Sequence, residues 1–265
     1  MARADLAARQ PEQPNTGTVT EDAFLGGKLI VRQPARGYRA GLDAVLLAAT
    51  IPANASGRIL DVGAGVGTVG LCVAARLPSA NVTLLERETV LAELARENIS
   101  ANGLADRMTI MTADIAKISA EKAALELTDA SFSEVLANPP YHNQSSGSLP
   151  PDALKATSHA MADDGLETWV RFMTRMTQAG GRAVMIHKTE MLPRILQAYD
   201  GRFGAIRVLP IHPRAGESAH RILVSGIKGS RAPLSLLSGL VLHGAGNEFT
   251  PEVDAILRHG AALPL

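Results

Sequence analysis

The hydrophobic positions of this chain fall into two alternating patterns. Short continuous apolar runs, typical of strands buried on both faces, are separated by segments in which apolar residues recur at helical spacing. The predicted strands are Arg58–Val62, Val82–Glu86, Met108–Met111, Ser133–Ala137, Arg182–His187, Ile206–Ile211 and Arg221–Ile227. The predicted helices are Leu42–Ala49, Thr68–Leu77, Val90–Asn102, a mixed stretch 115–126, Leu166–Gln178 and Glu190–Tyr199.

Regular alternation of strands and helices is typical of a parallel sheet with helices on both faces. We therefore expect a Rossmann-like α/β domain. The last two predicted strands have no helix between them, so we expect them to be antiparallel neighbours.

Shorter elements are expected on either side of this alternation. Phe24–Val31 predicts a hairpin that turns at Gly26-Gly27. Leu240–His243 predicts a short strand, and Pro251 is suited to begin a short helix. The domain organisation we expect is a flexible segment 1–20, a domain 21–232 that includes the hairpin, and an extension 233–265 packed on the same domain.

The composition narrows the class of protein. With 46% hydrophobic residues among 265, the chain can bury a full core. The single cysteine, Cys72, excludes an internal disulfide framework, and its apolar helical surroundings predict a buried, inert thiol. The lone Trp169 is expected to be a packing anchor. The sequence shows no closely spaced Cys/His/Glu cluster, so it predicts no metal site. It also has no apolar stretch long enough to cross a bilayer. We expect a cytoplasmic enzyme or binding protein.

The charges are balanced overall but unevenly distributed. Residues 1–170 hold 14 Lys and Arg against 20 Asp and Glu, whereas residues 171–265 hold 12 against 6. Two ordinary solvated faces would explain this distribution. A second interpretation is a surface that contacts RNA phosphates, because basic runs flank the candidate site in sequence. The residues predicted for that surface are Lys28, Arg32, Arg36, Arg214 and Arg221.

A glycine-rich loop follows the first strand of the alternation. Asp61-Val62-Gly63-Ala64-Gly65-Val66-Gly67 leads from that strand into a helix, and closely spaced glycines permit both a tight turn and close approach of a ligand. The G-x-G-x-x-G pattern of nicotinamide cofactors fails, because Thr68 stands at its last glycine. The acid two residues before the first glycine suits the ammonium of a methionyl group.

Two further acids follow the next two strands. Glu86, next to Arg87, is placed to accept from ribose hydroxyls, and Ala113-Asp114 to accept from an adenine amino group. A single acid at a strand end is equally well explained as a helix N-cap. Three acids after three successive strands favour one crevice, because the carboxyl ends of parallel strands lie together. These residues predict bound S-adenosylmethionine, with S-adenosylhomocysteine as its product.

The fourth strand runs directly into Asn138-Pro139-Pro140-Tyr141. The Asn138 side-chain oxygen and the Pro139 carbonyl can each accept an N–H of a conjugated amino group, which frees its lone pair to attack a methyl group. The two prolines stiffen the loop, and Tyr141 offers a ring on which a base can stack. An ordinary Asn-Pro turn is the simpler alternative. The position of the four-residue motif directly after the fourth strand, beside the predicted cofactor crevice, favours a catalytic role.

Together these motifs resemble the amino-methyltransferase branch of the class I methyltransferases, whose sheet has seven strands with the last one antiparallel. The segment Gly37–Leu47 is similar to one in the bacterial family that methylates N6 of the adenine 3′ to the anticodon of a valine tRNA. That resemblance implies that Tyr38, Arg39, Gly41 and Asp43 close over the methionyl end of the cofactor.

The resemblance leaves several activities open. The leading hypothesis is methylation of adenine N6 in tRNA, and a ribosomal RNA guanine-N2 methyltransferase is a close rival. A protein glutamine-N5 methyltransferase is disfavoured, because the region before the glycine loop predicts a hairpin and a loop in place of a helical domain. A nicotinamide oxidoreductase conflicts with Thr68. A non-catalytic RNA-binding module would not need three acids at strand ends.

Overall fold

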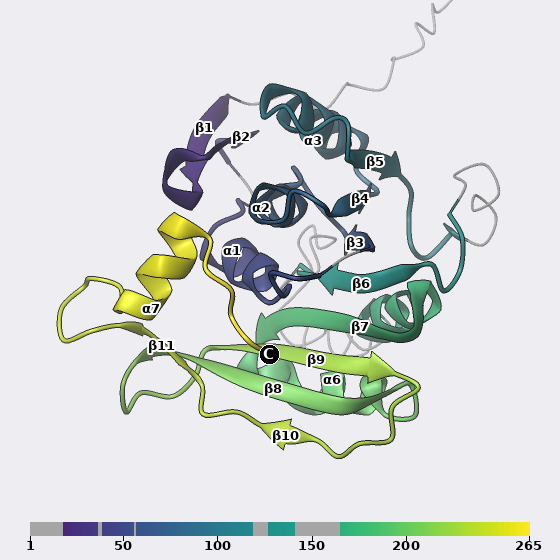
Figure 1. The fold of residues 1–265 in the computed structure, drawn as a ribbon, viewed down its shortest axis with the longest axis vertical. Helices are drawn as coiled ribbons and strands as arrows, with labels where there is room; N and C mark the ends of the chain where they lie inside the picture. The colour runs from purple at the N-terminus through teal and green to yellow at the C-terminus, as the bar shows by residue number, and fades with distance from the viewer. Residues whose placement is uncertain (1–17, 37–38, 56, 119–126, 141–164) are drawn as a thin grey trace, which may run out of the picture.

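A computed structural model describes residues 18–36, 39–55, 57–118, 127–140 and 165–265. Its main sheet contains β3 Arg58–Val62, β4 Asn81–Glu86, β5 Met108–Thr112, β6 Phe132–Ala137, β7 Thr177–Lys188, β8 Phe203–Arg214, β9 Arg221–Lys228, β10 Ser235–Leu236 and β11 Leu240–His243. The strand order is β10-β8-β9-β7-β6-β3-β4-β5, and β11 also pairs with β8 (Figure 1).

The direction of the strands confirms the predicted fold class. Strands β5, β4, β3, β6 and β7 are parallel neighbours, whereas β9 lies antiparallel between β7 and β8. These seven strands correspond to the seven predicted from apolar runs. Strands β10 and β11 both pair in parallel with β8 and extend that side of the sheet.

Helices cover both faces of the sheet (Figure 1). They are α1 Leu42–Ala49, α2 Thr68–Arg76, α3 Thr89–Ala101, a helix at 165–176, α6 Leu192–Tyr199 and α7 Pro251–Asp254. Alternate residues of each strand enter two separate cores: Ile59 packs in the core with α1, α2 and α3, and Leu60 packs with 165–176 and α6. Cys72 lies in the first core with no exposed surface, and burial raises the pKa of its thiol to about 12, as expected of an inert cysteine.

The N-terminal hairpin consists of β1 Val19–Phe24 and β2 Leu29–Pro34. The chain turns at Gly26 with φ +67°, and a Cβ there would lie 2.6 Å from the Arg258 carbonyl oxygen. That oxygen belongs to a π-helical segment, Ala255–His259, which continues from α7. The hairpin therefore packs against the C-terminal extension, and β1 begins two residues before the boundary predicted for the domain.

The structure corrects several predicted boundaries. The helix predicted to reach Gln178 ends at residue 176, because Thr177 already pairs with Phe132 of β6. Gly180-Gly181 lies inside β7 at an irregularity in this pairing, where two steps along β6, from Phe132 to Glu134, oppose five steps along β7, from Thr177 to Arg182. The helix predicted from Glu190 begins as a 3-10 turn, and most of the mixed stretch 115–126 lies outside the described residues.

A buried ion pair fixes β7 to its surroundings. Arg182 Nε donates to Glu134 Oε2 at 2.9 Å, and the two side chains are 10% and 13% exposed. The same guanidinium donates to the carbonyl oxygens of Thr50 and Leu265. One arginine thus joins the sheet, the end of α1 and the C-terminal segment. Among the described residues no helix has the length and apolar character needed to cross a membrane.

Candidate functional site

The carboxyl ends of the parallel strands bring the predicted site residues to one edge of the sheet. Strand β3 leads into the glycine loop, β4 ends at Glu86, β5 is followed by Ala113-Asp114, and β6 is followed by Asn138. The register aligns these ends, with Val62 opposite Leu85 on one side and Ala137 on the other. The glycine loop and Asn138 are therefore neighbours, as the sequence predicts.

The glycine loop is held in a conformation that only glycine adopts easily. Gly63, Gly65 and Gly67 have φ values of +65°, +56° and +88°, in the left-handed region. The Ala64 amide donates to the Leu85 carbonyl at 3.0 Å, which fixes the loop to the end of β4. A Cβ at Gly63 would lie 2.2 Å from the Trp169 ring, so this ring packs directly against the loop.

A pocket opens between the glycine loop, α1 and the hairpin. Its empty space, counted together with its opening to solvent, is about 430 Å³. It is lined by Gln33, Ala40, Ala44, Asp61, Gly63, Ala64, Gly65, Val66, Thr68, Val69, Leu91 and Asn138. The lining thus joins the first predicted acid, part of the glycine loop and Asn138.

Asp61 is the buried acid of this pocket, with 1% of its surface exposed. Its Oδ2 accepts from the Gly70 amide at 3.1 Å. Burial raises the pKa of Asp61 to about 7, the Gly70 hydrogen bond lowers it, and the neighbouring Glu86 carboxylate raises it further. A carboxylate this costly to ionise is stabilised by a cation placed next to it.

Glu86 is mainly engaged with the backbone. Its two carboxylate oxygens accept from the amides of Gly65, Arg87 and Glu88 at 2.8 to 2.9 Å. A carboxylate offers about four acceptor positions, so one remains for a hydroxyl. The Arg87 side chain is 64% exposed and pairs with Glu88, away from the pocket lining.

Asp114 is partly occupied as a turn cap. Its Oδ1 accepts from the Ala116 amide at 2.9 Å, the capping role that was the alternative for a lone acid. The preceding Ala113 is buried, and its amide donates to the Glu86 carbonyl at 2.9 Å, which places the ends of β4 and β5 side by side. Neither Asp114 nor Glu86 is among the residues lining the pocket.

The motif after β6 is only partly described. Asn138 is half-buried at the pocket wall, Pro139 is buried and Pro140 is exposed. Tyr141 lies outside the described residues. Asn138 lines the same pocket as Asp61 and Gly63, so an amide side chain shares this pocket with the glycine loop.

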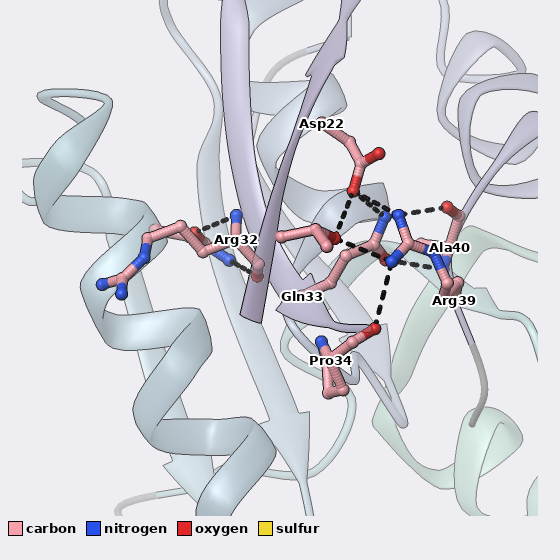
Figure 2. Close-up of polar contacts among 8 residues, drawn as sticks. Asp22, Arg32, Gln33, Pro34, Arg39 and Ala40 are labelled. Carbon is pink, nitrogen blue, oxygen red and sulfur yellow. Dashed lines mark hydrogen bonds and ion pairs between the residues drawn. The ribbon is translucent and has the colours of Figure 1, made fainter. Parts of the chain in front are cut away.

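The segment expected to close over the methionyl end has several partners within the chain. Tyr38 lies outside the described residues. Arg39 donates to Asp22, at 2.6 Å, and to the Thr20 hydroxyl and Pro34 carbonyl of the hairpin (Figure 2). Gly41 is the N-cap of α1. Among the described residues of Gly37–Leu47, Ala40 and Ala44 line the pocket.

Asp43, in the first turn of α1, pairs with Arg221 at the start of β9. The Arg221 Nε to Asp43 Oδ2 distance is 3.1 Å. A residue predicted for the cofactor thus contacts one predicted for RNA. His187, at the end of β7, is buried close to this pair, and burial with the charges of Lys188 and Arg221 lowers the pKa of its imidazole to about 4.

The other residues predicted for an RNA surface are spread over the molecule. Lys28 donates to the His259 carbonyl, Arg32 pairs with Glu97, and Arg36 is exposed beside the hairpin. Arg214 donates to the Gly246 carbonyl and to Asn247. Arg214 ends β8 and Arg221 begins β9, and these two strands are antiparallel neighbours with Ile211 opposite Arg221.

The pocket fits the cofactor that the sequence predicts. A Cβ added at Gly65 would meet no atom within 4 Å, so the backbone there is open to a close ligand. The Thr68 hydroxyl lines the pocket at the start of α2, is buried and has no hydrogen-bond partner among the described residues. A buried hydroxyl of this kind is costly unless a ligand supplies the partner. The Asp61 carboxylate lines the same pocket. Together, the Thr68 hydroxyl and the Asp61 carboxylate suit the zwitterionic amino-acid end of the cofactor.

Seven residues of the pocket lining are not among the site residues predicted from the sequence: Gln33, Ala40, Ala44, Val66, Thr68, Val69 and Leu91. Gln33 is 2% exposed and lines the pocket. A polar residue on a hairpin gives no periodic signal, so the sequence pattern does not single out Gln33. Trp169 is a packing residue, as predicted, but its packing surface is Gly63 of the glycine loop. No group of three or more potential metal ligands was found in the part of the chain that the structure describes.

Comparisons with known proteins identify similar chains. Residues 39–171 match the family model described as the methyltransferase small domain. The chain is 28% identical over 243 residues to a tRNA1(Val) (adenine(37)-N6)-methyltransferase of Porphyromonas gingivalis, covering 87% of this chain and 91% of that protein. It is 27% identical to the protein of the same name from Vibrio campbellii, covering 71% of this chain and 74% of that one.

Solved structures described as methyltransferases are also similar to this chain. A crystal structure described as a predicted O-methyltransferase from Agrobacterium tumefaciens is 35% identical, with a TM-score of 0.70, and covers 84% of this chain and 99% of that chain. An S-adenosylmethionine-dependent O-methyltransferase from Thermotoga maritima is 19% identical, with a TM-score of 0.51, and covers 74% of this chain and 68% of that one. The second likeness concerns the fold alone.

Proposed function

Since this chain belongs to the methyltransferase small domain family and is an S-adenosylmethionine-dependent methyltransferase, we propose that it methylates an exocyclic amino nitrogen. The proposed acceptor is N6 of an adenine in tRNA, at the position 3′ to the anticodon of a valine tRNA. The observation that carries the proposal is Asn138 on the wall of the pocket that also contains Asp61 and the glycine loop.

The cofactor is proposed to lie along the carboxyl ends of β3, β4 and β5. When bound, it supplies a methyl group activated by a sulfonium. Asp61 stabilises the ammonium of the methionyl group, and Gly63 and Gly65 allow close approach of the ligand. Glu86 uses its remaining acceptor position for a ribose hydroxyl. Asp114 accepts from the adenine amino group through Oδ2, since its Oδ1 is bonded to Ala116.

Asn138 and Pro139 orient the amino group that accepts the methyl. The amide oxygen of Asn138 and the carbonyl of Pro139 each accept one N–H, which turns the nitrogen lone pair toward the methyl group. An amide cannot take up a proton, so this arrangement suits an amine better than a hydroxyl. A hydroxyl acceptor, as in the name of the Agrobacterium relative, must instead give up its proton to a base before it can attack.

The choice of tRNA is supported by the names of the relatives and by the Gly37–Leu47 segment. Arg214 and Arg221 are proposed to contact phosphates, with Lys28, Arg32 and Arg36 as weaker candidates. Changing Arg214 to Glu reverses one charge, so RNA binding is expected to weaken and its dependence on salt to become shallower by about one unit of slope. Affinity for S-adenosylhomocysteine is the control, and an unchanged salt slope would remove Arg214 from the RNA surface.

The decisive experiment separates substrate classes. The enzyme is incubated with labelled S-adenosylmethionine and, separately, total tRNA, ribosomal RNA and protein, and the methylated product is identified. Label in tRNA as N6-methyladenosine is expected. Label in ribosomal RNA as N2-methylguanosine, or in protein glutamine, would replace the proposal with one of its rivals.

A variant tests the role of Asn138 in the same assay. Asn138→Ala is expected to lower kcat at least about a hundredfold, the scale for loss of a preorganised polar group, while affinity for S-adenosylhomocysteine stays within about threefold. Full activity in this variant would exclude Asn138 from the reaction centre.

A further inference from the structure

Strand β2 of the hairpin is bonded to both sides of the cofactor pocket. One side is the segment around Ala40, and the other is the glycine loop at Val66; both residues line the pocket. Two neighbouring residues of β2 make these connections. The Gln33 side chain bonds Ala40 directly, and the Arg32 main chain is linked to Val66 through the Asn98 side chain. The hairpin is thus joined to two walls that are far apart in the sequence.

Gln33 makes the connection to Ala40. Its Oε1 accepts from the Ala40 amide at 2.9 Å, and its Nε2 donates to the Ala40 carbonyl at 3.4 Å and to Asp22 Oδ2 at 2.9 Å (Figure 2). Asp22 Oδ2 also accepts from Arg39. Gln33 is 2% exposed, so these bonds form away from bulk water. One buried amide thus bonds both main-chain polar groups of Ala40, as a neighbouring strand would.

Asn98 of α3 makes the connection to the glycine loop. Its Oδ1 accepts from the Arg32 amide at 2.8 Å, and its Nδ2 donates to the carbonyls of Arg32 at 2.9 Å and Val66 at 3.0 Å. The side chain has no exposed surface. A buried amide with three bonds of good length has little freedom to move.

We propose that Gln33 and Asn98 are positioning residues for the cofactor, which hold Ala40 and Val66 at the separation that the methionyl group requires. This inference rests on the cofactor placement proposed above. Neither side chain takes part in methyl transfer. Their effect is on the shape of the pocket before the cofactor binds, so they contribute to affinity rather than to the chemical step.

Asn102 provides a matched control on the same helix. It lies one turn after Asn98 and bonds Ile30 of β2 in the same way, with its Oδ1 accepting from the amide at 3.0 Å and its Nδ2 donating to the carbonyl at 2.8 Å. Its Nδ2 also donates to the Asn98 carbonyl at 2.8 Å, within α3 and outside the pocket lining. Asn98→Ala and Asn102→Ala each remove a pair of hydrogen bonds to one residue of β2, and only the first removes a bond to the glycine loop.

The test measures S-adenosylhomocysteine binding by calorimetry together with steady-state kinetics. Asn98→Ala is expected to raise the Kd and the KM for S-adenosylmethionine about tenfold and to leave kcat within about twofold, a pattern of lost ground-state binding. Asn102→Ala is expected to leave all three within about twofold. Equal effects of the two variants would overturn the proposal, because they would reflect general loosening of the hairpin.

Gln33→Ala tests the other wall independently, should Asn98→Ala fold poorly. Hydrogen exchange of the Ala40 amide is expected to become faster, and the Kd for S-adenosylhomocysteine to rise about tenfold. Faster exchange with an unchanged Kd would overturn the positioning role while leaving the cofactor placement intact. Failure of the wild-type protein to bind S-adenosylhomocysteine would instead overturn the placement, and the positioning role with it.

Discussion

Asp61→Asn is expected to make the free protein more stable at neutral and alkaline pH. Burial raises the pKa of Asp61 from 3.8 to about 7, so folding disfavours its carboxylate. The stability linked to the protonated acid is fully present below about pH 3.8 and is lost as pH rises toward 7. A shift of about three units corresponds to roughly 4 kcal/mol at pH 8. Asparagine keeps an oxygen for the Gly70 amide and cannot ionise.

Urea denaturation of the free protein between pH 4 and pH 8.5 measures this effect. At pH 4 the variant and the wild type are expected to agree within about 1 kcal/mol, because Asp61 is then neutral in the folded protein and only partly ionised in the unfolded chain. At pH 8 the variant is expected to be more stable by about 2–4 kcal/mol, after allowing for a weaker hydrogen bond to Gly70. Equal stability at pH 8 would refute the derived cost of the buried carboxylate.

Proton release on cofactor binding gives a second measure of the ionisation of Asp61. An ammonium next to Asp61 favours the carboxylate, so binding at about pH 6.5 is expected to release up to about one proton. Calorimetry of S-adenosylhomocysteine in buffers with different ionisation enthalpies measures that number. Asp61→Asn is expected to release none and to bind about tenfold to a hundredfold more weakly, as for loss of a charged hydrogen bond. Proton release that persists in the variant would assign the titration to another group.

Two further predictions concern stability. Burial and the positive charges of Lys188 and Arg221 lower the pKa of His187 from 6.5 to about 4, so the stability linked to its neutral form is present above pH 6.5 and lost as pH falls to 4, by about 3 kcal/mol. Urea denaturation at pH 7 and pH 4.5 should show a smaller acid loss in His187→Gln, and an identical loss would contradict this. Arg182→Met leaves the Glu134 carboxylate buried without its ion pair and is expected to cost about 3–5 kcal/mol, with part of it recovered by adding Glu134→Gln. A cost below about 1 kcal/mol would mean that solvent reaches Glu134.

The strands of the main sheet were predictable because their apolar runs are continuous. Arg58–Val62 was predicted with the bounds that β3 has in the structure. Edges were less predictable: β1 starts at Val19, since a hairpin with mostly half-buried or exposed residues leaves no clear alternation. The start of β7 at Thr177 also escaped prediction, because pairing with β6 overrides the helical spacing of its residues. Strand β10 has only two residues, both exposed, and no sequence signal marks it.

The candidate site was also predictable only in part. The glycine loop, its acids and Asn138 could be placed together because parallel strands share one edge for their carboxyl ends. The partners of the charged groups could not be predicted, since they come from distant parts of the chain. Arg39 is bonded to Asp22 of the hairpin, and Asp43 to Arg221, which lies 178 residues further on. Spacing along a sequence carries no information about such pairs.

The contact between the hairpin and the π-helical segment Ala255–His259 has a consequence for biosynthesis. Lys28 donates to the His259 carbonyl across 231 residues, and Gly26 lies against Arg258. Contacts this distant in sequence carry a large loop-closure entropy and form late. While the chain is still being translated, the hairpin has no surface of this kind to dock on. A nascent chain halted before residue 255 is therefore expected to leave the turn of the hairpin at Gly26 uncovered and more open to proteases.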